Sequence, residues 1–176
     1  MKILITGGAG FIGANTAKRF IENGHEVVIF DNLSRERVER NLEWLKEFGK
    51  YTFIKGDVRN FDELAEVFGE NRFDAVFHFA AQVAVTTSVS NPRFDFENNL
   101  FGSFNLLEAV RISGQNPIII YSSTNKVHGG LEDKRVELDG KRYKLIDAPA
   151  GISESCHLDF HSPYGCSKGA ADQYFR

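Results

Sequence analysis

The chain has 176 residues, a length typical of one domain. Its 21 basic and 24 acidic residues give a net charge of −3 with no basic block, which excludes a generic electrostatic affinity for nucleic acid. A hydrophobic fraction of 42% is typical of a globular protein. No apolar run approaches the ~18 residues of a membrane span, and the opening run ends at Thr6, too early for a secretory signal. We therefore expect a soluble, cytoplasmic domain that binds neither nucleic acid nor membrane.

Strands and helices are expected to alternate along most of the chain. Short β-branched and apolar runs predict strands over residues 2–6, 26–30, 51–55, 75–79 and 118–121. Helical spacing of apolar residues predicts helices over 11–23, 35–48, 61–68 and, from residue 92 or 93, to 113. Such alternation is typical of right-handed βαβ units. The expected fold is therefore α/β, a Rossmann-like doubly wound parallel sheet of five strands in the order 3-2-1-4-5.

The pattern loosens after Gly130, so residues 130–162 are expected to form a loop-rich insert within a single Rossmann domain, 1–176. Residues 136–145 inside it predict a hairpin, because Asp139-Gly140 is a type I′ turn signal. A final helix is expected to begin near Pro163. Cys156 and Cys166 are interpreted as free thiols rather than a disulfide, and their spacing predicts no metal site.

A glycine-rich loop joins the first strand to the first helix. Residues 3–13 read ILITGGAGFIG, in which Gly8, Gly10 and Gly13 satisfy the dinucleotide fingerprint in its required strand–turn–helix context. Gly7 or Gly8 permits the tight turn, and Gly10 lets the backbone approach a pyrophosphate. The N-terminus of the following helix adds unpaired N–H groups, so this loop predicts dinucleotide binding.

Two aspartates follow the second and third strands. Asp31 lies 18 residues after Gly13, where an acidic side chain binds the ribose hydroxyls and repels a 2′-phosphate. This position favours NAD over NADP, although Arg35 and Arg37 lie close by. Asp57 either reaches the adenine or serves as an N-cap or turn residue, and both alternatives stay open here.

A tyrosine and a lysine are predicted to share one face of the last helix. Tyr164 and Lys168 are four residues apart, and an ammonium near a phenol favours the phenolate. Such a pair can take a proton from a sugar hydroxyl while a hydride leaves the same carbon. The hydroxyls of Ser123 and Thr124 follow the fifth strand, at the sheet edge where open parallel sheets bind ligands.

Taken together, these motifs resemble the extended short-chain dehydrogenases/reductases, the family of NAD-dependent nucleotide-sugar epimerases and dehydratases. The residues that carry the resemblance are TGGAGFIG (6–13), DNLS (31–34), GDVR (56–59), HFAAQ (78–82), NNLFGS (98–103), YSST (121–124) and YGCSK (164–168). Within the family the chain most resembles the CDP-paratose 2-epimerases, through DNLSR (31–35), NLEWL (41–45), SSTNKV (122–127) and DFHSPYGCSKGAADQY (159–174). Asn125-Lys126 replaces the Asp-Glu pair of the sugar dehydratases, which argues against water elimination.

The resemblance implies a role for each matching residue. Thr124, Tyr164 and Lys168 would be catalytic, and no metal would take part. The implied cofactor-binding residues are Gly7, Gly10, Phe11, Ile12, Gly13, Asp31, Asn32, Ser34, Arg35, Asp57, Val58, Ala80, Ala81, Gln82, Asn99, Ser122, Tyr164 and Lys168. Two positions depart from the family, where His128 replaces a tyrosine and Ser103 replaces a threonine.

The implied reaction converts CDP-paratose to CDP-tyvelose at C2 by transient oxidation and re-reduction with NAD. The partner would be a nucleotide-sugar, with a CDP-sugar favoured. The family's C-terminal substrate lobe is absent from these 176 residues. Two alternatives therefore stay open: an NAD-binding module without turnover, and a UDP-hexose 4-epimerase. The phenylalanines of 93–113 are expected to pack in the core or to pair with a second subunit, in a homodimer or a higher homo-oligomer.

Overall fold

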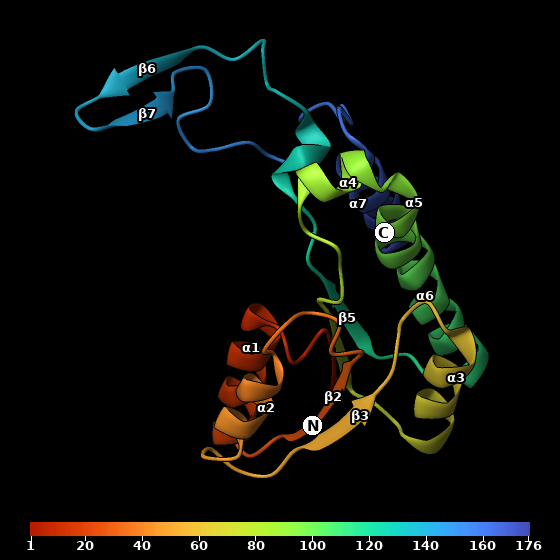
Figure 1. Cartoon of the computed structure of the whole chain (residues 1–176). Coiled ribbons are helices and arrows are strands. Elements are labelled where there is room, and N and C mark those ends of the chain that lie inside the picture. The colour runs from red at the N-terminus through yellow and green to blue at the C-terminus, as the bar shows by residue number, and fades with distance from the viewer.

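The computed structural model, which describes residues 1–176, contains a five-stranded parallel sheet in the order β3-β2-β1-β4-β5 (Figure 1). Its strands are β1 (Lys2–Thr6), β2 (Glu26–Asp31), β3 (Thr52–Lys55), β4 (Ala75–His78) and β5 (Ile118–Tyr121). All four pairings are parallel. The predicted fold class and strand order are confirmed. The order reverses between β1 and β4, which is where open α/β sheets form ligand crevices.

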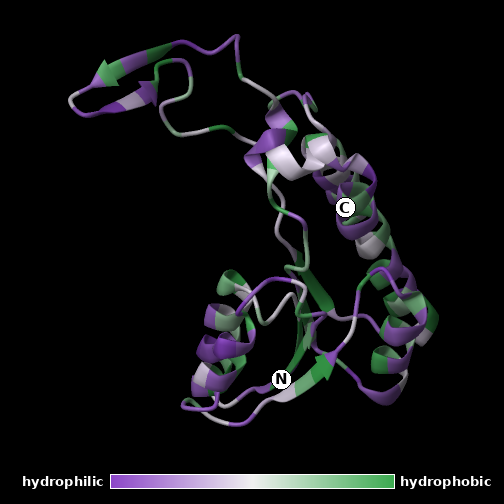
Figure 2. Ribbon diagram, in the orientation of Figure 1, coloured by the Kyte–Doolittle hydropathy of each residue, from purple (hydrophilic) through white to green (hydrophobic).

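Helices cover both faces of the sheet (Figure 1). On one face lie α1 (Phe11–Glu22) and α2 (Glu39–Leu45), and on the other lie α3 (Phe61–Glu70) and α6 (Gly102–Ser113). The central strands contribute to both cores, with Ile3 and Ile29 facing α1 and α2, and Leu4 and Phe30 facing the opposite helices. Figure 2 shows the central strands in the green of hydrophobic residues. Burial on both faces explains why these strands are continuous apolar runs.

The helix predicted over 35–48 is shorter in the structure, where α2 spans only Glu39–Leu45. Arg37 has a positive φ of 67°, a left-handed conformation that a helix cannot include, so the chain turns there before the helix begins. Trp44 packs edge-on against Phe48, with ring centroids 5.0 Å apart, and lies beside the α1–α2 core.

The segment predicted as one helix over 92–113 is built from three parts. It comprises α5 (Pro92–Phe96), a π-helical turn (Glu97–Phe101) and α6, and an unpredicted short helix, α4 (Val85–Ser90), precedes it. The predicted core face is wrong in part, because Phe96 and Phe104 are 50% and 42% exposed. The first half of the segment instead buries polar side chains: Asp95, Asn99 and Ser103. Apolar periodicity cannot reveal such a face, and the wider π-helical turn also shifts the register of the helix.

The predicted hairpin is confirmed as β6 (Val136–Asp139) and β7 (Arg142–Leu145), which project away from the sheet (Figure 1). Gly140 in its turn has a φ of +65°. Both cysteines are free thiols, as predicted. The last helix, α7 (Pro163–Tyr174), begins after Ser162, whose hydroxyl accepts a 3.0 Å hydrogen bond from the Gly165 N–H. None of the helices has both the length and the apolar character that a membrane crossing requires.

The register of α6 can be tested by truncating two neighbouring side chains. Leu106 is fully buried in the core between the sheet, α3 and α6, whereas Phe104 lies on the opposite, exposed face. We expect Leu106→Ala to lower the free energy of unfolding by about 2–5 kcal/mol, since it leaves a cavity. We expect Phe104→Ala to change it by less than about 1 kcal/mol. Urea unfolding measures both, and a larger loss for Phe104→Ala would contradict the observed register.

Candidate active site

A cleft of about 430 Å³ opens at the carboxyl ends of β1, β2 and β4. It is lined by most of the residues that the sequence singled out: Gly7, Gly10, Phe11, Ile12, Gly13, Asp31, Asn32, Ser34, Arg35, Val58, Ala80, Ala81, Ser122, Tyr164 and Lys168. The glycine loop and the Tyr164–Lys168 pair, more than 150 residues apart in the chain, therefore border the same cleft.

The cleft also contains Ser123, whose hydroxyl the sequence placed at this sheet edge, and six residues that were not predicted to bind the cofactor: Phe30, Val38, Gly56, Phe79, Val83 and Asn98. Several of them are immediate neighbours of predicted residues. Phe30 precedes Asp31, and Asn98 precedes Asn99. The sequence signal for these residues was their place in or beside a motif. That signal does not say which of two neighbouring side chains faces the cleft.

In the glycine loop the backbone lies so close to other backbone atoms that two positions have no room for a Cβ. Gly7 has a φ of +68°, and a Cβ there would lie 2.6 Å from the Ala80 nitrogen on the β4 loop. A Cβ on Gly13 would lie 2.3 Å from the Gly7 carbonyl oxygen, so only glycine fits both positions. Gly10 begins α1 without a side-chain cap, and the first turn of that helix carries no acidic residue. The amides of this turn are therefore available to an anion such as a pyrophosphate.

Asp31 ties the glycine loop to the end of β2. Its Oδ2 accepts a 3.0 Å hydrogen bond from the Ala9 N–H, and its Oδ1 accepts a 2.8 Å bond from the Leu33 N–H. Asn41 on α2 holds the same loop from the other side, donating to the Ala9 carbonyl at 2.7 Å. Each carboxylate oxygen of Asp31 retains a free lone pair, and the residue lines the cleft. It is placed to accept hydrogen bonds from ribose hydroxyls.

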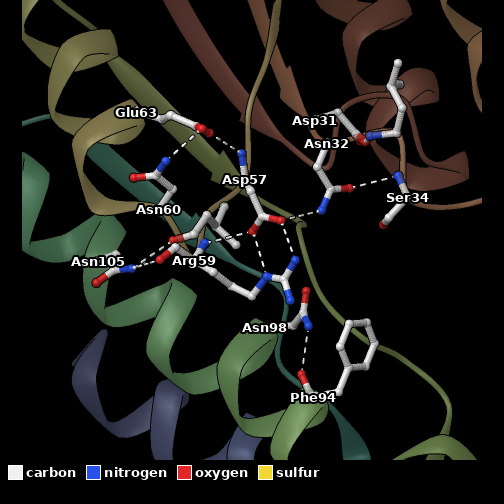
Figure 3. Close-up of polar contacts among 12 residues, drawn as sticks. Asp31, Asn32, Ser34, Asp57, Arg59, Asn60, Glu63, Phe94, Asn98 and Asn105 are labelled. Carbon is white, nitrogen blue, oxygen red and sulfur yellow. Dashed lines mark hydrogen bonds and ion pairs between the residues drawn. The ribbon is translucent and has the colours of Figure 1, made fainter.

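Asp57 lies beside the cleft rather than in its lining, and Figure 3 shows its carboxylate surrounded by donors. Arg59 donates to it from Nε at 3.0 Å and from Nη2 at 2.7 Å, and Asn32 Nδ2 donates at 2.9 Å. These contacts, the Arg59 guanidinium first, lower the pKa of Asp57 to about 2. The N-cap of α3 is Asn60, so Asp57 is not an N-cap. It is a turn residue, as the same alternative allowed, because its carbonyl accepts from the Asn60 N–H and its Oδ1 from the Arg59 N–H, each at 2.9 Å. Its neighbours Gly56 and Val58 line the cleft instead.

The Tyr164–Lys168 pair lies in the first two turns of α7 and is almost completely buried, at 8% and 3% exposure. Lys168 Nζ donates to the Ser122 carbonyl at 2.6 Å and lies 4.1 Å from the centre of the Tyr121 ring. Burial lowers the pKa of Lys168 to about 8, against the opposing effect of Asp172 and Asp95. The ammonium form therefore predominates at neutral pH.

Besides Asp57, three predicted site residues are not among those that line the cleft: Thr124, Gln82 and Asn99. Thr124 caps the 3-10 helix Asn125–His128, where its hydroxyl accepts a 3.3 Å hydrogen bond from the Lys126 N–H. Gln82 and Asn99 are buried and bind each other, with the Gln82 N–H donating to Asn99 Oδ1 at 2.8 Å. Their side chains form hydrogen bonds to other protein groups behind the cleft wall.

Sequence comparison assigns the family. A family model described as GDP-mannose 4,6 dehydratase matches residues 4–176. The chain belongs to this family, which in turn lies among the extended short-chain dehydrogenases/reductases. The glycine loop, Asp31 and the Tyr164–Lys168 pair around one cleft agree with that assignment.

Particular relatives are epimerases. The chain is 52% identical to CDP-paratose 2-epimerase of Salmonella typhi over 174 residues, which cover 99% of this chain and 52% of that protein. It is 40% identical over 131 residues to a UDP-glucose 4-epimerase of Klebsiella pneumoniae, covering 73% of this chain and 93% of that protein. This chain therefore spans about half the length of the Salmonella enzyme.

Two solved structures with a similar fold are also epimerases. The UDP-Glc/GlcNAc 4-epimerase of Campylobacter jejuni superposes with a TM-score of 0.83 at 32% identity, over 98% of this chain and 47% of that one. The UDP-glucose 4-epimerase of Thermus thermophilus, solved as a complex with NAD, gives 0.75 at 31% identity, over 99% and 49%. The family is thus one of NAD-dependent nucleotide-sugar epimerases.

The ion pair of Asp57 makes a pH-dependent contribution to stability. Its folded pKa of about 2 lies below the usual aspartate value of 3.8, so the stabilisation is complete above about pH 5 and is lost as the pH falls from about 4 to about 2. We expect Asp57→Asn to lower the free energy of unfolding by about 1–2 kcal/mol at pH 7, with a smaller difference from wild type at pH 3.

Urea unfolding of both proteins at pH 7, 5 and 3 measures this difference. Glu66→Gln, the same change of carboxylate to amide at an exposed position on α3, serves as the matched control. A difference between Asp57→Asn and wild type that is constant from pH 7 to pH 3 would show that the ion pair does not carry the effect.

Proposed function

We propose that this chain binds NAD in the cleft between β1 and β4 and serves a nucleotide-sugar epimerase. The observation that carries the proposal is the shared cleft, which has the glycine loop and Asp31 on one side and the Tyr164–Lys168 pair on the other. A dinucleotide laid across it would be held at its pyrophosphate by the α1 N-terminus and at its adenosine ribose by Asp31, and its nicotinamide would lie near Tyr164.

The residues around the cleft suit that cofactor. The glycines leave room for backbone contact with the pyrophosphate, since a side chain at Gly7 or Gly13 would collide with the chain itself. The Asp31 carboxylate accepts hydrogen bonds from ribose hydroxyls and repels a 2′-phosphate, so NAD is preferred to NADP. The solved Thermus relative, a complex with NAD, supports the same choice.

The catalytic roles follow from proton chemistry. Tyr164, next to the Lys168 ammonium, takes the proton from a sugar hydroxyl as the base and returns it as the acid. Lys168, held by the Ser122 carbonyl, would bind the nicotinamide ribose. The family resemblance gives Thr124 the role of binding the reacting oxygen of the sugar; for this its hydroxyl, which here accepts from the Lys126 N–H, would have to turn toward the cleft. Bound NAD supplies a two-electron acceptor that can also return the electrons to the opposite face of the sugar.

We propose CDP-paratose as the substrate, with epimerisation at C2 to CDP-tyvelose. The support is the 52% identity to the Salmonella CDP-paratose 2-epimerase over nearly the whole chain. Similarity to UDP-glucose 4-epimerases, in sequence and in fold, makes a UDP-hexose 4-epimerase the second candidate. The third is an NAD-binding module that does not turn over a sugar.

We also propose that the protein is a cytoplasmic homo-oligomer. Phe96, Phe101 and Phe104 on the α5–α6 segment and Tyr174 on α7 are 42–59% exposed. The Tyr174 ring packs edge-on against Phe104, with centroids 5.7 Å apart, so the aromatic surface continues from one helix to the other. Exposed aromatic surface of this kind is typical of subunit interfaces.

Calorimetric titration tests cofactor binding. We expect NAD to bind the chain at least about tenfold more tightly than NADP, because Asp31 repels a 2′-phosphate. Asp31→Ala should weaken NAD binding and remove the preference, while Glu66→Gln should change neither. A wild-type chain that does not bind NAD would overturn the proposed function.

Turnover distinguishes the candidate functions. With NAD bound, CDP-paratose and UDP-glucose are each offered, and formation of the epimer is followed by proton NMR. We expect turnover of the CDP-sugar alone, and a loss of about 10²–10⁴-fold in kcat for Tyr164→Phe, since the variant lacks the acid–base group. Turnover of UDP-glucose instead would favour the 4-epimerase, and NAD binding without any turnover would favour the binding module.

A further inference from the structure

A fully buried carboxylate lies behind the cleft wall, at Asp95 near the end of α5. A buried carboxylate is costly to desolvate unless hydrogen bonds replace its water. Three side chains supply them: Gln82 Nε2 donates to Oδ1 at 2.8 Å, Asn99 Nδ2 donates to Oδ1 at 3.1 Å, and the Ser167 hydroxyl donates to Oδ2 at 2.5 Å. Asp95 is therefore fully satisfied and fixed in one orientation.

The donors to Asp95 come from three segments: α7, the loop after β4 and the π-helical turn Glu97–Phe101. Ser167 lies on α7 between Tyr164 and Lys168, and Asn99 Nδ2 also donates to its hydroxyl oxygen at 3.1 Å. Gln82 follows Ala80 and Ala81, which line the cleft. One carboxylate thus joins the helix that carries the catalytic pair to the loop after β4.

We propose that Asp95 is a positioning residue, whose carboxylate holds the α7 turn of Tyr164 and Lys168, through Ser167, against the Gln82 segment of the cleft wall. Its significance for catalysis rests on the proposed function, but the structural link does not. Asp95 touches neither the cleft lining nor the reacting atoms, so it acts through its neighbours.

The same carboxylate contributes to the electrostatic environment of Lys168. The groups that face this lysine are Asp172 on its own helix, Asp95 from α5, Tyr121 from β5 and His78 from β4. The two carboxylates raise the Lys168 pKa, and burial lowers it. Burial and the Lys168 charge lower the pKa of His78 to about 3, so His78 is neutral and Tyr121, whose pKa is raised, is un-ionised at neutral pH.

The test compares Asp95→Asn with wild type and with Glu66→Gln, the matched change at an exposed carboxylate. Asparagine keeps the shape of aspartate and can still bind Gln82, Asn99 and Ser167, but it removes the charge. NMR titration of the Lys168 side chain measures its pKa, and hydrogen exchange measures the protection of the amides of residues 164–169. Circular dichroism confirms that each variant is folded.

We expect Asp95→Asn to lower the Lys168 pKa by about half a unit or more, and to accelerate amide exchange in this turn by about tenfold. Ser167→Ala keeps the charge and cuts the link, so it should accelerate exchange in the same turn. A folded Asp95→Asn with wild-type values of both measurements would overturn the proposal. If Asp95→Asn does not fold, unchanged exchange in Ser167→Ala overturns it.

Neither measurement needs NAD, so the two proposals fail separately. A wild-type chain that does not bind NAD removes the proposed function, while the pKa and exchange data still decide whether Asp95 positions α7. Conversely, NAD binding together with wild-type behaviour of Asp95→Asn leaves the function in place and removes the role of Asp95.

Discussion

A continuous series of buried hydrogen bonds joins β1 to α7, and the rest of the site depends on it. The Ser103 hydroxyl donates to the Asn99 carbonyl, so it accepts from His78 Nε2–H at 3.0 Å. Burial lowers the pKa of His78, so the ring is neutral and its Nδ1 carries no proton. Nδ1 therefore accepts from the Thr6 hydroxyl, 2.6 Å away, and the Thr6 oxygen accepts in turn from the Ala80 N–H at 3.3 Å.

This arrangement determines which side of the α5–α6 segment faces inward. Asp95, Asn99 and Ser103 form buried hydrogen bonds and therefore face the interior. The phenylalanines at positions 96 and 104 consequently face solvent. The π-helical turn Glu97–Phe101 places Asn99 between β4 and α7. Such turns are frequent at functional sites, where a helix must present side chains that a regular spacing would not align. The buried polar side chains and the exposed phenylalanines therefore both result from the orientation of this helical segment.

Features that depend on local patterns could be predicted from the sequence. The buried strands, the glycine loop with Asp31, and Tyr164 four residues before Lys168 each follow from spacing within one or two elements, and the parallel sheet brings them together. Features that depend on distant partners could not be predicted. Asp95 gives no signal of burial, because its donors lie up to 72 residues away in the chain. The left-handed Arg37 that delays α2 likewise follows from no propensity rule.

The fine choice between neighbouring residues was also beyond sequence reasoning. Ser123 lines the cleft, whereas Thr124, one residue later, caps a 3-10 helix. Asp57 turns its carboxylate to Arg59 and Asn32, and the residues on either side of it face the cleft. The direction of the backbone after a strand decides which of two neighbouring side chains faces the cleft. Tertiary contacts set that direction. A family motif therefore leads to the segment that borders the cleft, but it does not say which side chain of that segment lines it.

One NAD molecule is proposed to span the cleft from the glycine loop to the Tyr164–Lys168 pair. Mapping NMR shift changes on addition of NAD tests this proposal most directly. We expect large changes at the amides of Gly10, Gly13 and Asp31, and also at the Tyr164 ring and the Lys168 side chain. Saturable changes confined to one of these two groups, or the absence of changes at both, would contradict it.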